Sequence, residues 1–378
     1  MARDTGDWAS TKVMRGRTLR VVAHDPFPTN ASGERLPLPA NFVMGMGGAT
    51  QTLLDLTPTG HVGRALDIGC GSGAQTLFLP AERIIATDID ARALEAANAS
   101  CYLSGFRNLE PNVWRNGTSV VEFRQGSLLD PVPNQRFDLV VSNPPFIIEG
   151  AGHTHRDSPF HGDALTRELL TQLPSYLNAG GRAVLLASWL HPEGVDWTER
   201  LADWTSGVDA SVWIAQREVL DIDDYVAVWS ADAALPREQQ LLWRARLNEL
   251  GADGIGFGWI VIERSTSHWC HIEDVSAAAR VPMGNEVEAQ LRAFSRMPSA
   301  LDLLHGRWSF VTDHWRGDLA LGAFEAMLLE GVRSGVTLDE AISTVSSANP
   351  VDADDLLALG LSATRFLVEL GYLVPATD

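Results

Sequence analysis

The feature that most constrains the fold is the segment 65–73, which reads ALDIGCGSG. An apolar stretch runs up to Asp67, as is typical of a buried strand, and glycines follow at positions 69, 71 and 73. Glycine adopts backbone angles that other residues avoid and lets a ligand approach the backbone closely. A helix that begins after such a turn presents its N-terminus to that ligand. The segment therefore predicts a ligand site at the end of a strand.

A carboxylate further along the chain indicates which kind of ligand this is. Asp88 ends the next apolar stretch, 21 residues after Asp67. A carboxylate at that place can accept hydrogen bonds from both ribose hydroxyls of an adenosine-type ligand. The loop also fits the dinucleotide fingerprint GxGxxG/A, so by itself it does not distinguish a dinucleotide from another ligand of this type.

Strand-like and helix-like segments alternate from about residue 41. We expect strands over 64–69, 83–87, 119–124, 137–142, 182–187, 208–214 and 255–262. We expect helices over about 73–80, 91–103, 163–177 and 237–250, and a polar insertion over 108–118. This alternation predicts an α/β fold with a doubly wound, mostly parallel sheet of seven strands.

The two ends of the chain differ in composition from this region. Residues 1–40 are largely polar and contain four prolines after residue 25, which predicts an N-terminal arm. Residues 41–270 form the predicted main domain. Residues 275–378 show helical spacing, with a helix expected to begin at Thr337, and end in an apolar stretch at 370–375. They predict a small helical domain that is winged-helix-like.

A second motif, Asn143-Pro144-Pro145-Phe146, follows the fourth expected strand. Two prolines cannot continue a strand ladder, so carbonyl groups are left free there. Asn143 adds a side-chain acceptor and Phe146 adds a flat apolar face. These groups suit a planar nitrogen, whose hydrogens the acceptors would hold while the ring packs against its plane. A strand-ending turn capped by Asn143 is the structural alternative, which the glycine loop and Asp88 make less favoured.

With these motifs the chain resembles the class I S-adenosylmethionine-dependent methyltransferases, in the subgroup marked by Asn/Asp-Pro-Pro-Phe/Tyr. Release-factor glutamine methyltransferases and adenine-amino methyltransferases belong to that subgroup. The resemblance covers roughly residues 41–265 and rests on DIGCGSG, Asp88, GSLLD at 126–130 and NPPF at 143–146. It implies a Rossmann-like sheet with strand order 3-2-1-4-5-7-6, in which the seventh strand is antiparallel.

The resemblance also implies S-adenosyl-L-methionine as the cofactor and assigns residues to it. Asp67 and the three loop glycines would hold the methionine part, Asp88 the ribose, and Ser127 and Leu128 the adenine. Family members often carry Asp where Ser127 stands, so the adenine contact differs here. The cofactor-binding residues implied are Asp67, Gly69, Gly71, Gly73, Asp88, Ile89, Ser127, Leu128 and Asn143.

The chemistry expected at this site is transfer of a methyl group to nitrogen. A sulfonium is already a good leaving group, so the protein mainly has to align nitrogen, methyl and sulfur. Positive charge grows on the nitrogen, and the carbonyls of Asn143 and Pro144 are placed to stabilise it. We therefore expect the four motif residues (Asn143, Pro144, Pro145 and Phe146) to be catalytic and the acceptor to be an amide, guanidinium or amino nitrogen, with no metal involved.

Further polar residues follow the motif and are candidates for contact with the substrate. They are His155, Arg156, Asp157, Asp163 and Trp189. A histidine of this region could instead act as a base for an oxygen acceptor. The open alternatives are an O-methyltransferase of a natural product, a protein or nucleic-acid N-methyltransferase, and a binding module on the same fold. A nicotinamide-dependent oxidoreductase is disfavoured, because that fold has no role for NPPF.

Charge and cysteine content bear on partners and location. The chain of 378 residues has 29 basic and 48 acidic residues, a net charge of −19, of which −17 falls in 151–378. Since nucleic acids are bound through Lys and Arg, we expect a small-molecule or peptide acceptor and not a nucleic acid. The three cysteines match no metal spacing, and the first residues lack the apolar core of a signal peptide. These observations predict a cytoplasmic protein with no membrane association.

Overall fold

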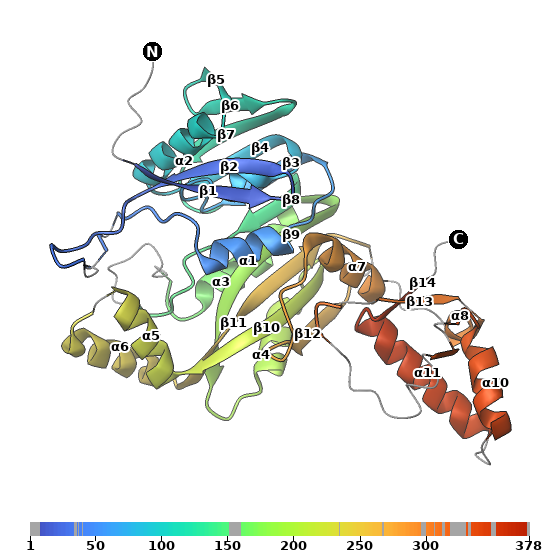
Figure 1. The fold of residues 1–378 in the computed structure, drawn as a ribbon. Coiled ribbons are helices and arrows are strands. Elements are labelled where there is room, and N and C mark those ends of the chain that lie inside the picture. Colours follow the sequence, from blue (N-terminus) through green and yellow to red (C-terminus); the bar gives the residue numbers. More distant parts are fainter. Residues whose placement is uncertain are drawn as a thin grey trace. The chain divides into compact units, whose positions relative to one another are not determined.

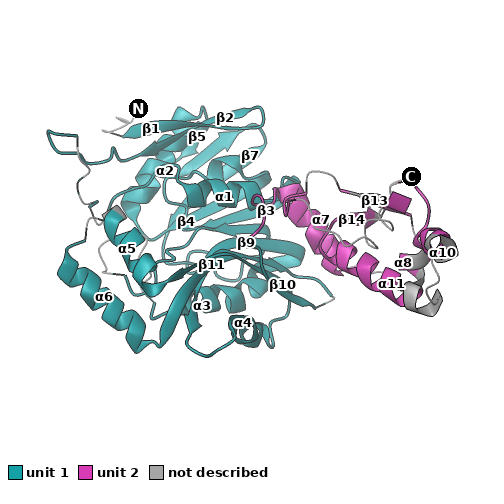
Figure 2. Ribbon diagram, turned by 60° about the horizontal axis from the view of Figure 1, so that its bottom comes forward, with its two compact units in different colours: residues 1–276 teal, residues 277–378 magenta. Residues whose placement is uncertain are grey.

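The computed structural model contains two compact units, residues 1–276 and residues 277–378 (Figure 2). It describes residues 8–375 except 34–35, 37, 40, 151–159, 234, 267, 296–299, 306, 312–313, 318–329, 332–333 and 349–352. No described helix is long and apolar enough to cross a membrane. The expected cytoplasmic location stays a prediction.

A ten-stranded sheet forms the centre of the first unit (Figure 1). Its order is β12-β10-β11-β9-β8-β3-β4-β7-β6-β5. The strands are β3 (Val62–Ile68), β4 (Ala81–Asp88), β5 (Arg107–Glu110), β6 (Val113–Asn116), β7 (Ser119–Gln125), β8 (Phe137–Ser142), β9 (Leu177–Pro192), β10 (Ser211–Asp221), β11 (Ala252–Glu263) and β12 (Cys270–Asp274). Within it the seven expected strands take the predicted order, and β11 is antiparallel to both neighbours. The α/β fold class is confirmed.

Helices cover both faces of this sheet. Figure 2 shows α1 (Gly48–Leu56) and α2 (Ala91–Leu103) on one face, and α3 (Ala164–Gln172) and α4 (Trp197–Thr205) on the other. The larger core cluster joins α3 and α4 to the sheet through residues such as Leu66, Leu169 and Leu201, all at most 1% exposed. Two-sided burial explains why the parallel strands read as continuous apolar runs.

Two further helices lie between β10 and β11. They are α5 (Ile222–Ala233) and α6 (Arg237–Glu249). Their buried side chains, including Tyr225, Trp243 and Leu247, form a separate cluster with Ile147 and Ile148, which directly follow the NPPF motif. Since β10 and β11 are antiparallel neighbours, a turn of a few residues could join them. The two helices are therefore not needed for strand pairing.

Three local expectations differ from the structure. Residues 1–40 were expected to be an arm, but β1 (Ala9–Arg15) and β2 (Thr18–His24) form a hairpin. The hairpin packs on α2 because Val22 and Ala23 are fully buried and the Ala23 N–H donates to the Ser100 hydroxyl at 2.7 Å. The expected insertion at 108–118 is the β5–β6 hairpin at the sheet edge. The expected helix at 73–80 is only a short 3₁₀ turn, η1 (Thr76–Phe78), since β4 already begins at Ala81.

The second unit is mainly helical where it is described. It contains α7 (Gly284–Ser295), α8 (Ala300–His305), β13 (Trp308–Phe310), α10 (Leu338–Ala348), α11 (Ala353–Glu369) and β14 (Leu373–Pro375). The expected start at Thr337 is a capping box, in which Thr337 Oγ1 accepts from Glu340 N and Glu340 Oε2 accepts from Thr337 N. β13 and β14 pair antiparallel. The winged-helix comparison stays a prediction.

The close pairing of β10 with β11 yields a test of the sheet. A Cβ at Gly258 would lie 1.8 Å from the Ala215 carbonyl oxygen, and backbone cannot move away. We expect Gly258→Ala to lower the free energy of unfolding by about 3 kcal/mol or more in urea denaturation, at the upper end of overpacking effects. Gly48→Ala is the control, since a Cβ there meets nothing within 4 Å. Equal stability of the two variants would contradict this register.

Candidate functional site

The glycine loop and the NPPF motif lie at the same edge of the sheet. β3, β4 and β8 are parallel neighbours, and Ile68 at the end of β3 pairs with both Thr87 and Ser142. The Ser142 hydroxyl donates to the Ile68 carbonyl at 3.0 Å and fastens the two strand ends together. The residues that directly follow these strands therefore meet at the carboxyl edge, where open α/β sheets bind ligands.

The loop glycines have conformations that explain their identity. Gly69, Gly71 and Gly73 have φ of +69°, +52° and +79°, which other residues rarely adopt. A Cβ at Gly73 would approach Ala97 at 3.2 Å, whereas at Gly69 and Gly71 it would meet nothing within 4 Å. Gly73 is thus needed for packing against α2. Gly69 and Gly71 turn the backbone beside open space, as a ligand-binding loop requires.

Asp88 closes this loop from the next strand. Its carboxylate accepts from the Gly71 N–H at 2.8 Å and from the Asp90 N–H at 2.9 Å. Burial raises the pKa of Asp88 above its ordinary value of 3.8, and these backbone donors oppose the rise. Each carboxylate oxygen can accept more than one hydrogen bond, so both remain able to receive a hydroxyl. Beside it the Ile89 side chain is 70% exposed, which provides an apolar surface at the loop.

Asp67 lies beneath the loop and is 1% exposed. The Thr76 hydroxyl donates to its carboxylate at 2.5 Å. Burial raises the pKa of Asp67 to about 7; the nearby charge of Asp88 adds to the rise and the Thr76 hydrogen bond opposes it. A cation bound next to this group would favour its charged form.

The segment proposed for the adenine borders the same edge. Ser127 is exposed, while Leu128 is half-buried and has φ of +45°. The Thr87 hydroxyl donates to the Leu128 carbonyl at 3.3 Å, which connects the segment to the end of β4. A leucine with positive φ costs of order 1 kcal/mol, and such strain is concentrated at functional sites.

The NPPF motif presents an unsatisfied acceptor. In the part of the chain that the structure describes, Asn143 Oδ1 is buried and has no hydrogen-bond partner. The two residues that follow are prolines, which have no N–H to donate to it. A buried polar atom without a partner lowers the stability of the folded protein by about 1–3 kcal/mol, so such atoms are rare and usually have a specific cause. A hydrogen-bond donor on a bound methyl acceptor would supply the partner that Asn143 Oδ1 lacks.

Neighbouring elements fix the segment that follows Asn143. The Phe146 carbonyl accepts from the Ser188 hydroxyl at 2.7 Å, and its ring lies edge-on to Trp229 at 5.9 Å. The Tyr225 hydroxyl accepts from Ile148 N at 2.8 Å, and Trp243 Nε1 donates to the Ile148 carbonyl at 2.9 Å. The α5–α6 pair therefore holds this segment in place. No sequence motif marks either helix as part of the site.

The structure places the candidate substrate residues in different surroundings, and three of them are not described. His155, Arg156 and Asp157 lie outside the described residues. Trp189 is fully buried and donates to Gln216, so it is a core residue and the expectation of substrate contact is wrong for it. Asp163 is 9% exposed, forms an ion pair with Arg200 at 2.8 Å and accepts from Leu190 N, so it is held in structural contacts.

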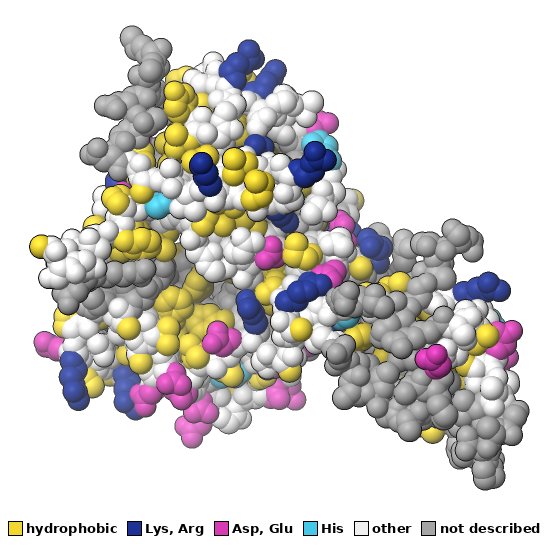
Figure 3. Space-filling model, in the orientation of Figure 1, with side chains coloured by type: hydrophobic (Ala, Val, Ile, Leu, Met, Phe, Trp, Pro, Cys, Tyr) yellow, Lys and Arg dark blue, Asp and Glu magenta, His cyan; other side chains and the backbone are white. Residues whose placement is uncertain are grey.

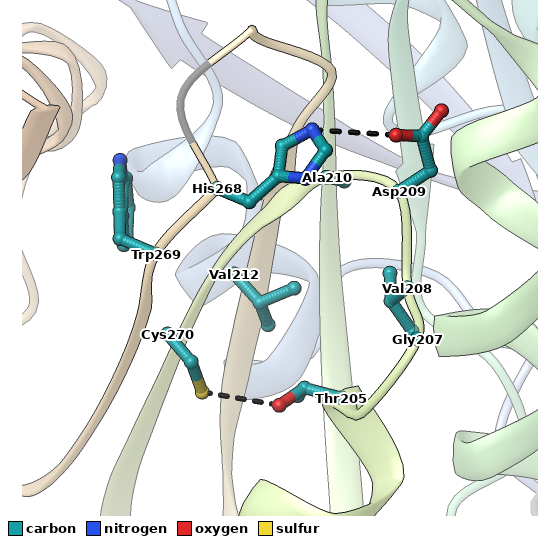
Figure 4. Close-up of a pocket in the computed structure, with 9 residues that line it drawn as sticks. All are labelled: Thr205, Gly207, Val208, Asp209, Ala210, Val212, His268, Trp269 and Cys270. Atoms are coloured by element: carbon teal, nitrogen blue, oxygen red, sulfur yellow. Dashed lines mark hydrogen bonds and ion pairs between the residues drawn. The ribbon is translucent and has the colours of Figure 1, made fainter.

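A separate pocket lies away from this edge (Figure 4). Residues 205, 207–210 and 212, around the start of β10, and 268–270, at the start of β12, line a volume of about 390 Å³. Within it His268 faces Asp209 at 3.3 Å, and the Thr205 hydroxyl contacts Cys270 Sγ at 3.3 Å. β10 runs parallel to β9 and β8, so its start lies at the amino edge of the sheet. The pocket is therefore not part of the loop site.

Comparison with known proteins agrees with the site. Residues 44–192 match the methyltransferase small domain family. A release factor glutamine methyltransferase of Xylella fastidiosa (strain 9a5c) is 36% identical over 143 residues, 33% of this chain and 47% of that protein. Ribosomal RNA small subunit methyltransferase C of Alcanivorax borkumensis is 28% identical over 131 residues, 34% of this chain and 33% of that protein. The chain thus spans about half or less of the length of these curated relatives.

Two further proteins are similar to parts of this chain. A ribosomal protein uL3 glutamine methyltransferase of Bordetella pertussis is 29% identical over 140 residues, 33% of this chain and 43% of that protein. A solved T. thermophilus 16S rRNA N2 G1207 methyltransferase, in complex with AdoMet and guanosine, has 17% identity and a TM-score of 0.34 over 52% of this chain and 45% of that chain.

These matches correct one expectation and confirm two. We expected a small-molecule or peptide acceptor and no nucleic acid. This expectation is wrong, because the relatives are named for protein and RNA substrates. It rested on net charge, although binding of phosphates depends on the charges in local contact. The resemblance to S-adenosylmethionine-dependent methyltransferases is confirmed, and with it the cofactor. Over residues 44–192, about two fifths of its length, the chain is thus similar to the methyltransferase small domain family.

Proposed function

We propose that the protein transfers a methyl group from S-adenosylmethionine to a planar nitrogen of a macromolecule, either a side-chain amide of a protein or an amino group of an RNA base. The observation that carries this proposal is the buried Oδ1 of Asn143, next to Pro144 and Pro145, which has no hydrogen-bond partner among the described residues. An amide or amino nitrogen offers the N–H donor that this oxygen lacks. The relatives named for protein glutamine and for RNA support both kinds of acceptor.

The residues at the carboxyl edge have distinct roles in this proposal. The cofactor supplies an electrophilic methyl group on a positively charged sulfur. Asp88, positioned by the Gly71 and Asp90 N–H groups, would accept from the ribose hydroxyls. Gly69 and Gly71 leave room for close approach of the ligand to the backbone. Asp67 provides a carboxyl group that a nearby positive charge would ionise.

Asn143 acts on the acceptor nitrogen. Its Oδ1 accepts an N–H hydrogen bond, which orients the nitrogen lone pair toward the methyl group and stabilises the positive charge that grows as the N–C bond forms. Phe146, whose carbonyl is held by Ser188, packs against the acceptor plane. After transfer the nitrogen loses a proton. An acceptor whose lone pair is delocalised needs this alignment more than it needs a strong base.

An oxygen acceptor would need a base at the same edge. His161, the described histidine nearest the motif along the chain, faces Glu149 at 2.7 Å and is largely exposed. That contact ties it to Glu149 rather than to the Asn143 oxygen. The nitrogen acceptor is therefore the better supported reading.

Substitution of Asp88 tests the cofactor site. We expect Asp88→Ala to weaken S-adenosylmethionine binding about 10- to 100-fold in calorimetry, because hydrogen bonds to a charged group contribute about 1.5–3 kcal/mol each. Asp130→Ala, the loss of an exposed carboxylate on the neighbouring segment, is the control and should bind normally. Normal binding by Asp88→Ala would exclude the assigned ribose contact.

Substitution of Asn143 tests the catalytic role. We expect Asn143→Ala to lower turnover about 100-fold or more with cofactor affinity retained, since it removes an acceptor placed for the transition state. The measurement is transfer of labelled methyl into separated protein and RNA fractions of ribosomal extracts. Asn178→Ala is the matched control, because its amide contacts Asp138 at the opposite edge of the sheet. Near-normal turnover of Asn143→Ala would contradict nitrogen methylation at this motif.

The raised pKa of Asp67 predicts a pH effect on stability. Because its pKa of about 7 exceeds the ordinary 3.8, the folded protein binds this proton more tightly than the unfolded chain. This group therefore lowers the free energy of unfolding as pH rises from about 4 to about 7, with no further change above. We expect Asp67→Asn, measured by urea denaturation without cofactor, to lack that decrease. Parallel pH profiles of variant and wild type would refute it.

A further inference from the structure

Four strands of the main sheet carry an arginine in one row across the sheet, which Val120 on β7 interrupts between β4 and β6. Arg64 on β3 pairs with Arg83 on β4, and Arg83 pairs with Val120 on β7. Val120 pairs with Arg115 on β6, which in turn pairs with Arg107 on β5. Paired residues on adjacent strands project to the same face of a sheet. We refer to Arg64, Arg83, Arg115 and Arg107 as the arginine row; at a strand spacing of about 4.8 Å it spans about 19 Å.

The positive charge of this row is not neutralised within the described part of the chain. Arg83, Arg107 and Arg115 are exposed, and the structure gives their side chains no ion pair or hydrogen bond among described residues. Arg64 donates to the neutral side chain of Gln135 at 2.7 Å. Arg107 and Arg115 stand directly opposite each other, an arrangement that destabilises a strand pair. A binding partner with negative charge would remove this repulsion.

Two acidic groups near the row are already engaged in other contacts. Glu122, two residues beyond Val120 on the same face, binds Arg124 at 2.7 Å. Asp138, next to Arg64 on β8, accepts from the Arg64 backbone N–H at 2.8 Å and from Asn178 at 2.7 Å. Within the part of the chain that the structure describes, no carboxylate forms an ion pair with Arg83, Arg107 or Arg115. Figure 3 shows Lys and Arg side chains at the end of this unit that carries β5 and β6.

We propose that the arginine row binds the phosphate backbone of an RNA that also carries the acceptor nitrogen, an inference that rests on the proposed function. Guanidinium groups bind phosphate oxygens in pairs of hydrogen bonds, and groups repeated along a line suit a chain of phosphates. Five residues separate Arg64 from Gly69 along β3, about 17 Å at 3.3 Å per residue. About five stacked nucleotides at 3.4 Å cover that distance. Because Leu66 and Ile68 on the same face of β3 are buried under α3 and α4, the RNA would pass outside this packed face, over β5 and β6 at the end of the sheet, to reach the edge with Asn143.

The test compares two variants with the same change in net charge. In one, Arg83, Arg107 and Arg115 are replaced by Gln; in the control, three exposed arginines elsewhere are replaced, namely Arg237, Arg292 and Arg365. Binding of a labelled 20-nucleotide single-stranded RNA is measured by anisotropy from 0.05 to 0.3 M NaCl. Polyglutamate of similar length is the acidic-polypeptide probe. Cofactor affinity and urea stability are measured on the same samples.

We expect the row variant to bind the RNA about 100-fold more weakly at 0.1 M salt, with the slope of log affinity against log salt smaller by about 2, since each phosphate contact on a single strand contributes about 0.7. The control should retain its affinity, and urea stability of the row variant should not fall, because it loses repulsion. Equal losses in both variants, tighter binding of polyglutamate than of RNA, or no RNA binding by the wild type would each overturn the proposal.

Failure of this inference is distinguishable from failure of the proposed function. The RNA measurement needs no methyl transfer, and the Asn143→Ala comparison can succeed on a protein acceptor whether or not the row binds RNA. Conversely, RNA binding by the row can hold even if Asn143 proves inactive in catalysis. A loss of cofactor affinity in the row variant would indicate altered folding and count against the row as a separate surface.

Discussion

The in-register, parallel pairing of β3 with β4 and β8 is the constraint on which the site depends. Ile68 aligns with Thr87 on one side and Ser142 on the other, so three strands end at one level. Asp88 and Asn143 take their places only as a consequence of that alignment. A slip of one residue would turn every side chain of a strand to the other face and move the motif away from the glycine loop. The Ser142–Ile68 hydrogen bond holds the ends of β8 and β3 at the same level beside the site.

Several features of the site lower the stability of the folded protein. Asn143 Oδ1 is buried without a partner among the residues that the structure describes, Leu128 has a positive φ, and Asp67 keeps a carboxyl group whose charged form burial disfavours. Each of these costs free energy in the ligand-free protein, and each is of a kind that a bound ligand can relieve. Their occurrence together at one edge distinguishes this edge from the pocket at the start of β10, whose polar side chains contact one another.

The sequence predicted the strand order and the edge of the site because the signals are local: apolar runs, glycines at fixed places, and prolines that end a strand. It did not predict the β1–β2 hairpin, whose short strands bury few side chains, such as Val13 and Val22. Nor could it separate Trp189, a buried core residue, from a substrate contact, because both occur near strand ends. The role of α5 and α6 depends on contacts across 77 and 95 residues, from Ile148 to Tyr225 and Trp243, which no local pattern records.

The wrong expectation about partners also arose because the sequence does not show which residues lie together in space. Net charge sums over the whole chain, and the excess of acids lies after residue 150. Charge in contact with a partner depends instead on register, which brings together arginines separated by up to 51 positions along the chain, from Arg64 to Arg115. Because screening limits interactions between exposed charges to about 10 Å, acids on distant surfaces scarcely weaken the field at such a row. A strongly acidic protein can therefore keep a surface suited to phosphates, provided that strand pairing concentrates its few cations.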